Sequence, residues 1–253
     1  VPLFHRHARG LILTEHGEQL FRTAREMMLK LETTRARLTD SRERPNGDLR
    51  ITTTVGLGTH WLTPRLGEFL DLYPEVRVQL ILTDEELDLS MREADVAIRL
   101  RQPTQPDLIQ RKLFSVHFHA YASPEYLKRF GTPRSFEELD NHRIIVLGGT
   151  IVPLYLENRK WLTEVARESK DPRLPHLAIN NVLGLLRAAQ RGLGIALLPD
   201  YLVEEGGGLV QLFSEEDSPL LEAYFVYPEE LKSVARVQAF RDFLVSKAQR
   251  WNF

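Results

Sequence analysis

Residues 49–55 read LRITTTV, and this apolar, β-branched run opens the stretch from which the architecture can be inferred. Further runs at 76–82 and 95–99 have the length and composition of strands. Between them, residues 61–73 place apolar side chains at helical spacing, and residues 87–92 predict a second, short helix. This alternation of strand and helix favours a parallel sheet with right-handed crossovers.

A second alternating unit occupies residues 116–250. Strands are predicted at 116–121, 143–147, 177–179, 194–198 and 220–227. Helices are predicted at 124–130, 136–139, 182–191 and 231–250. Residues 148–175 show little periodicity, and no helix or strand is predicted there. The fold class is therefore α/β.

The first fourteen residues predict a small hairpin. Apolar residues at 3–4 and 11–13 flank a turn at Ala8–Gly10, and Thr14 is a residue type that caps helix N-termini. A two-stranded ribbon is marginally stable alone. We therefore expect that its structural support precedes it in the parent protein.

Residues 15–43 predict one long helix, which ends at a charged hinge with Pro and Gly at 42–48. Its apolar positions recur at spacings of four and three, as in the seam of a coiled coil. They are Leu20, Ala24, Met27, Leu31, Thr34 and Leu38. We expect this helix to pair with the same helix of a second copy, and packing against its own domain is the alternative.

The composition is that of an ordinary globular protein. The 253 residues are 43% hydrophobic and 27% charged, and the absence of Cys excludes disulfides, thiolate zinc sites and cysteine nucleophiles. No apolar run approaches the ~18 residues of a membrane span, and no signal peptide is visible. We therefore expect a cytoplasmic protein without a membrane partner.

Charge is unevenly distributed along the chain. Residues 1–50 carry ten Lys+Arg against seven Asp+Glu, whereas residues 51–253 carry 23 against 28. Within residues 1–14 the only such charges are Arg6 and Arg9. A basic tip on an acidic body suits contact with a polyanion, and a solvated loop is the alternative.

Motifs for catalysis and nucleotide binding are absent: GxSxG, the P-loop, HExxH and GxGxxG do not occur. His117 and His119 share a strand face and could be two metal ligands, but no third ligand is evident. The acidic residues at 84–88 suit a carboxylate site or, as we prefer, a solvated helix start. We therefore predict no enzymatic activity, no metal and no cofactor.

Polar groups follow three of the predicted strands, where ligands bind in open α/β sheets. They are Thr54 with the nearby Gly56 and Gly58, Arg99, and Asn180 with Asn181. A hydroxyl, a guanidinium and two amides suit a small anion or carboxylate, and no nucleophile is activated. The alternatives are an N-cap for the threonine, an internal ion pair for the arginine, and turn and cap roles for the asparagines.

These features together resemble the LysR-type transcriptional regulators. At the start, Leu3-Phe4-x-Arg6-x-x-Arg9-Gly10-x-x-Leu13-Thr14-x-x-Gly17 is similar to their wing and the beginning of their linker helix. The later similar motifs are Gly47–Ile51, Leu62-Thr63-Pro64-x-Leu66-x-x-Phe69, Tyr73-Pro74-x-Val76, Ala94–Arg99 and Gly192–Pro199. Their order and spacing cover nearly the whole chain.

The resemblance implies a division of the chain. Residues 1–14 would be the wing remnant of a winged helix-turn-helix DNA-binding domain whose other helices are missing, and 15–46 the linker and dimerisation helix with its hinge. Residues 47–253 would be an effector-binding domain of two subdomains, like a type II periplasmic binding protein. Subdomain I would span about 47–114 and 215–253, and subdomain II about 115–214.

The resemblance also implies partners and sites: a small-molecule co-inducer in the cleft between subdomains, promoter DNA for the full-length protein, and a homodimer or homotetramer. The implied effector-binding residues are Thr54, Gly56, Leu57, Arg99, Leu100, Asn180 and Asn181; the DNA contacts are Arg6 and Arg9; the dimer seam is Leu20, Ala24, Met27, Leu31 and Leu38. Ligand binding would shift the population of subdomain arrangements and so the oligomer geometry. The rival hypotheses are a transporter's solute-binding protein, which leaves residues 1–44 unexplained, and an enzyme on the same fold.

Overall fold

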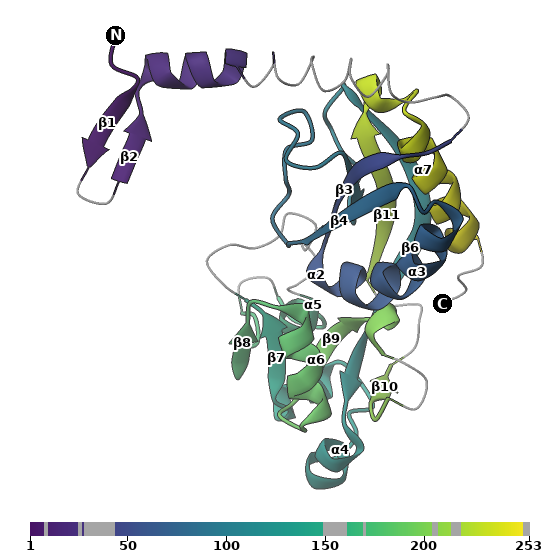
Figure 1. The fold of residues 1–253 in the computed structure, drawn as a ribbon. Helices are drawn as coiled ribbons and strands as arrows, with labels where there is room; N and C mark the ends of the chain where they lie inside the picture. Colours follow the sequence, from purple (N-terminus) through teal and green to yellow (C-terminus); the bar gives the residue numbers. More distant parts are fainter. Residues whose placement is uncertain are drawn as a thin grey trace.

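The computed structural model describes residues 1–7, 10–24, 27, 44–148, 161–168, 171–203, 207–213 and 219–249. Within these ranges the chain forms an N-terminal hairpin with a helix, and then two lobes (Figure 1). Lobe I contains β3, β4, β5, β11 and the first part of β6, and lobe II contains the rest of β6 with β7 to β10.

The N-terminal hairpin pairs β1 (Phe4–His7) with β2 (Gly10–Leu13) in antiparallel register, as predicted. Helix 15–24 follows, and the Thr14 hydroxyl caps it by accepting the Gly17 N–H at 3.0 Å. That hydroxyl also donates to the Pro2 carbonyl at 2.9 Å. A Cβ on Gly17 would lie only 2.0 Å from the Leu3 carbonyl oxygen, so glycine is required where helix and hairpin meet.

The described part of the linker helix presents its apolar side chains to solvent. Leu20 is 52% and Met27 is 68% exposed, and Ala24 is exposed as well. The other seam residues, Leu31, Thr34 and Leu38, lie outside the described residues. Exposed apolar side chains on one helix are what we expect of a helix that packs against a second copy. The dimer itself stays a prediction.

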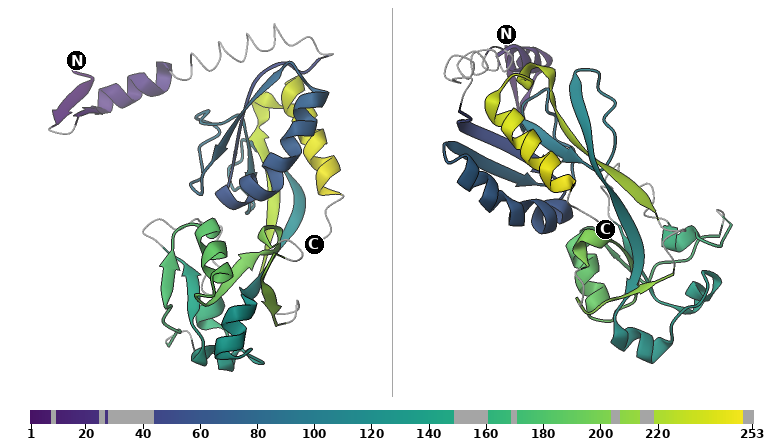
Figure 2. Two further views of the ribbon diagram at one scale, coloured as in Figure 1. Left: turned by 60° about the horizontal axis from the view of Figure 1, so that its bottom comes forward. Right: turned by 90° about the vertical axis from the view of Figure 1, so that its right-hand side faces the viewer.

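Lobe I is built on a mixed sheet with the strand order β4-β3-β5-β11-β6. The strands β3 (Gly47–Thr53), β4 (Val76–Leu82) and β5 (Val96–Arg99) are parallel, as predicted, whereas β11 (Leu220–Pro228) runs antiparallel to β5. Short turns α2 (Val55–Leu57) and η1 (Gly58–Leu62) lead into α3 (Thr63–Leu72). This helix packs beside α7 (Ala235–Ala248), with the Phe69 and Phe240 ring centroids 5.1 Å apart (Figure 2).

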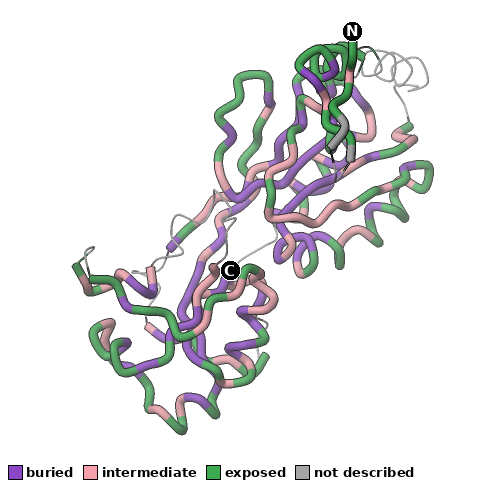
Figure 3. The backbone as a smooth tube through the Cα atoms, turned by 90° about the vertical axis from the view of Figure 1, so that its left-hand side faces the viewer, coloured by how far each residue is buried: buried purple, intermediate pink, exposed green. Residues whose placement is uncertain are grey.

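Lobe II has helices on both sides of a second sheet. The strands β7 (Ile144–Leu147), β8 (Leu177–Ile179) and β9 (Ile195–Pro199) are parallel, and β10 (Val210–Leu212) joins at the other side of β6. One apolar cluster centres on α6 (Val182–Gln190). Another gathers α4 (Pro124–Phe130), η2 (Glu137–Asn141) and α5 (Trp161–Glu164). Figure 3 shows buried strands running through the middle of both lobes.

Strand β6 (Leu108–Ala122) runs through both lobes without a break. Residues 108–117 pair with β11 in lobe I, and residues 118–122 pair with β9 and β10 in lobe II. A continuous strand is a natural pivot for relative motion of the lobes, because a small change in its twist moves everything beyond it. The subdomain boundaries given from the sequence stay a prediction.

Several sequence assignments need correction. The predicted helix at 87–92 is wrong: this segment forms turns, because the Asp88 and Glu93 side chains bind local backbone N–H groups instead of leaving them to a helix. The predicted helix at 231–250 is the turn η6 (Glu229–Leu231) followed by α7. The helix α5 and the strand β10 were not predicted, because with four and three residues they are too short to show a periodic pattern.

Candidate functional site

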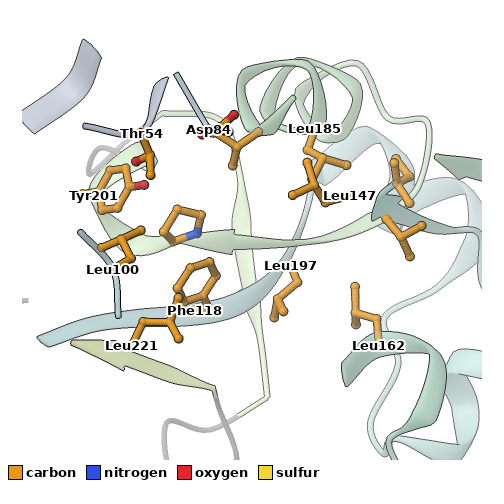
Figure 4. Close-up of a pocket in the computed structure, with 14 residues that line it drawn as sticks. Thr54, Asp84, Leu100, Phe118, Leu147, Leu162, Leu185, Leu197, Tyr201 and Leu221 are labelled. Carbon is orange, nitrogen blue, oxygen red and sulfur yellow. The ribbon is translucent and has the colours of Figure 1, made fainter. Parts of the chain in front are cut away.

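A cleft opens between the two lobes and is lined mainly by apolar side chains (Figure 4). Its empty volume is about 700 Å³, including the part that opens to solvent. Lobe I supplies Thr54, Asp84, Leu100 and Leu221, and lobe II supplies, among others, Leu147, Leu162, Leu185, Leu197 and Tyr201. A mainly apolar lining with a few polar groups suits a small organic molecule.

Three polar side chains stand together at one end of the cleft (Figure 4). Thr54 directly follows β3, Asp84 follows β4, and Tyr201 lies in the turn η4 (Asp200–Leu202) after β9. The Asp84 carboxylate accepts a hydrogen bond from the Val55 N–H at 3.2 Å. Burial raises the pKa of Tyr201, the charge of Asp84 adds to that rise, and the Thr54 hydroxyl opposes it. The phenol therefore keeps its proton at neutral pH.

Arg99 makes an internal contact rather than lining the apolar cleft. It is 6% exposed, donates to the Leu87 carbonyl at 2.9 Å, and lies 3.9 Å from the Glu86 carboxylate. Arg101 holds that same carboxylate with two hydrogen bonds of 2.5 and 2.7 Å. Burial lowers the pKa of Arg99, and the Glu86 charge opposes that change. The internal ion pair, which the sequence left open as an alternative, is what the structure shows.

A smaller hollow beside the cleft does bring Arg99 near Thr54 and Leu100. Its empty volume is about 320 Å³, and its rim carries three carboxylates, those of Asp84, Glu85 and Glu86. Glu86, one of the three, is already bound by Arg101. Of the predicted residues, Thr54 and Leu100 line both spaces.

The remaining predicted effector residues are not among the residues that line the cleft. Gly56 is buried against lobe II, and Leu57 is fully buried in the core of lobe I. Asn181 caps α6, its side-chain oxygen accepting the Leu183 N–H at 2.9 Å, which is the cap role that the sequence left open. Asn180 is exposed and does not line the cleft.

Sequence reasoning missed Asp84, Tyr201 and the leucines of lobe II. Ligands bind beyond the carboxyl ends of parallel strands, and this rule predicts Asp84 as well as Thr54, because Asp84 follows the end of β4. The sequence pattern had favoured a solvated helix start at this position. The apolar lining carries no local signal, since a cleft leucine and a core leucine have the same sequence pattern.

The paired histidines belong to a polar cluster on β6 and η4. The His119 Nδ1 lies 2.7 Å from the Asp200 carboxylate, which also accepts the Tyr121 hydroxyl at 3.0 Å. The rings of His117 and His119 are 6.5 Å apart. Within the described ranges, no group of three or more His, Asp or Glu side chains could hold a metal ion. No helix of this same part of the chain is long and apolar enough to cross a membrane.

Of the two arginines predicted to contact DNA, Arg6 belongs to β1 and pairs with Leu11 across the hairpin. Arg9 lies outside the described residues. The structure therefore supports the hairpin that would carry these side chains and leaves their contacts as a prediction.

Comparison with known proteins decides the family. A sequence model of the LysR substrate binding domain matches residues 42–249. The chain belongs to the LysR family. HTH-type transcriptional regulator CrgA of Neisseria meningitidis serogroup C is 32% identical over 251 residues, which cover 98% of this chain and 82% of that protein. HTH-type transcriptional activator TtdR of Escherichia coli K12 is 28% identical, covering 98% and 80%.

Solved structures of LysR-type regulators share this fold. The structure of CrgA from Neisseria meningitidis matches with a TM-score of 0.71 and 29% identity, covering 98% of this chain and 84% of that one. Full-length AphB of Vibrio cholerae, described as a virulence activator, matches with a TM-score of 0.68 and 25% identity, covering 97% and 84%. The two-lobed, type II periplasmic-binding-protein-like fold predicted from the sequence is thus confirmed. Because the LysR relatives are named as transcriptional regulators, a transporter's solute-binding protein is not favoured.

Proposed function

We propose that this chain is the ligand-sensing and oligomerising part of a DNA-binding transcriptional regulator. The names of the LysR relatives support the regulatory role, and the cleft supports binding of a small-molecule co-inducer. A regulator of promoter DNA acts in the cytoplasm, and its function requires binding rather than turnover.

The parts of the chain take separate roles in this proposal. Residues 1–14 form the wing, from which Arg6 and Arg9 contact the phosphate backbone or minor groove of DNA. Residues 15–46 pair two copies through the seam that includes the exposed Leu20 and Met27. Residues 47–253 sense the ligand.

The observation that carries the proposal is that both lobes line one cleft while a single strand, β6, runs through both. A ligand that touches both lobes has a different affinity for each arrangement of them, and it therefore shifts their populations. The relative placement of the lobes is then passed to the oligomer, which sets the spacing of the DNA-binding wings.

A ligand screen against the full chain tests the proposal. Small molecules that bind the cleft raise the melting temperature, because they bind the folded state and not the unfolded one. Leu147→Trp fills the cleft from the end of β7 and should abolish these shifts. Leu72→Trp places the same side chain at an exposed position on α3 and should leave them unchanged. Ligands that stabilise the Leu147→Trp protein equally would show that the cleft is not the sensing site.

A further inference from the structure

The chemistry of the cleft lining limits what it can bind. Most of the wall is hydrocarbon, contributed by leucines of both lobes such as Leu100, Leu185 and Leu197, together with Phe118. Such a wall holds the apolar body of a ligand and offers it no hydrogen bonds. Selectivity must therefore come from the polar end, where Thr54, Asp84 and Tyr201 stand.

Charge at the polar end has one sign. Asp84 is acidic, and none of the residues described as lining the cleft is a lysine, arginine or histidine. Arg99 and Arg101 do not line this cleft: Arg99 donates to the Leu87 carbonyl and lies 3.9 Å from Glu86, and Arg101 binds the Glu86 carboxylate with two hydrogen bonds. A carboxylate brought into the cleft would lose its hydration, meet the Asp84 charge, and find no cation among the lining residues that the structure describes.

Hydrogen-bonding capacity points in the same direction. An ionised carboxylate only accepts hydrogen bonds, and each of its two oxygens can accept more than one; one oxygen of Asp84 accepts the Val55 N–H. The hydroxyls of Thr54 and Tyr201 both donate and accept, so they can complete the contacts of an incoming alcohol or amine. The group that this end recognises best is a donor.

We propose that the cleft selects an apolar or aromatic molecule with one hydrogen-bond donor, an amine, alcohol or phenol, and that Asp84 rejects carboxylates. The inference rests on the proposed function and specifies the ligand class of the same cleft. It replaces the anion or carboxylate expected from the sequence, because Arg99, the residue that carried that expectation, does not line this cleft.

A matched ligand series tests this selection on the full chain. Phenylbutylamine, phenylbutanol and phenylbutyrate share one apolar body and differ only in the head group. By calorimetry, we expect the amine and the alcohol to bind at least about tenfold more tightly than the carboxylate. Asp84→Asn keeps the size of the side chain and an acceptor for Val55, but removes the charge. It should weaken the amine about tenfold, leave the alcohol nearly unchanged, and strengthen the carboxylate.

Glu85→Gln is the control variant, because it removes the same charge from an exposed neighbour that lines the smaller hollow and not the cleft. It should leave all three affinities unchanged. Phenylbutyrate binding as tightly as the amine, with binding lost in Leu147→Trp, would overturn the ligand class while the cleft remains the sensing site. If none of the three binds, the ligand class is also wrong. The ligand screen described under the proposed function then tests separately whether the cleft binds any small molecule.

Discussion

Gly56 of lobe I lies against Val182 of lobe II so closely that a side chain cannot fit between them. A Cβ at position 56 would stand 2.7 Å from a Val182 methyl carbon and 3.1 Å from the Tyr201 hydroxyl. Both neighbours also line the cleft. The approach of the two lobes beside the ligand site therefore depends on the absence of one side chain.

Gly56→Ala should act as a wedge between the lobes. The added methyl group must push Val182 and Tyr201 away, so we expect a larger radius of gyration by small-angle scattering and weaker ligand binding. Gly67→Ala is the matched control, because nothing lies within 4 Å of a Cβ at that exposed position in α3. It should leave the radius unchanged and raise stability by up to about 1 kcal/mol through helix propensity. A Gly56→Ala protein with unaltered radius and affinity would contradict the wedge.

Arg99→Met should destabilise the protein without reducing ligand affinity. The variant leaves the Leu87 carbonyl without its donor, and buried unsatisfied groups cost about 1–3 kcal/mol. Urea unfolding measures this loss, and calorimetry measures the affinity. Arg101→Met, at a partly exposed ion pair, should cost less than about 1 kcal/mol. An Arg99→Met protein of unchanged stability that binds its ligand about tenfold more weakly would show that Arg99 contacts the ligand.

Leu20→Asp should weaken self-association of the linker helix. Leu20 is 52% exposed in the single chain, so the charge disturbs little in the isolated fold but is costly within an apolar seam. Sedimentation at several concentrations should show a larger dissociation constant. Gln19→Asp, at the adjacent exposed position, is the control and should not change it. An oligomer unaffected by Leu20→Asp would disprove the seam.

Stability should fall in acid partly through His142. Burial lowers the pKa of this histidine below its ordinary 6.5, and Glu138 opposes the change. The Tyr126 hydroxyl accepts the Arg143 N–H at 2.8 Å and lies 3.2 Å from the His142 Nδ1, to which it can donate only if that nitrogen is unprotonated. The folded state therefore binds fewer protons than the unfolded state below pH 6.5. The free energy of unfolding decreases as the pH falls from there toward the lowered pKa of the folded state.

Unfolding by urea at a series of pH values measures this dependence. His142→Asn removes the titrating group, and its slope of stability against pH below 6.5 should be smaller. Equal slopes for the two proteins would assign the acid sensitivity to other groups.

Much of the sheet was predictable because its strands are rich in apolar and β-branched residues. The runs at 76–82 and 177–179 became β4 and β8 at those bounds, although both are edge strands whose residues are mostly only partly buried. The first half of β6 was not predicted. Gln110, Arg111 and Lys112 there are polar, since that part of the strand is exposed on one face or both.

The candidate site was only partly predictable. Position after a strand end identified Thr54 as a lining residue, the family resemblance added Leu100, and the strand-end rule would also have found Asp84. It could not tell that Arg99 turns toward Glu86, because the choice between an internal partner and a ligand depends on which side chains the turn at 83–89 places nearby.

The sequence by itself determined the order of the longer strands and helices, the family and the hairpin with its capping Thr14, because these depend on local pattern and on residues close along the chain. The tertiary structure alone decided the character of the cleft. Leu100, Leu185 and Tyr201 come from separate elements and line one cleft only because the two lobes fold against each other along β6. The charge at the ligand site is also decided by this packing, since Asp84 lines the cleft and Arg99 does not.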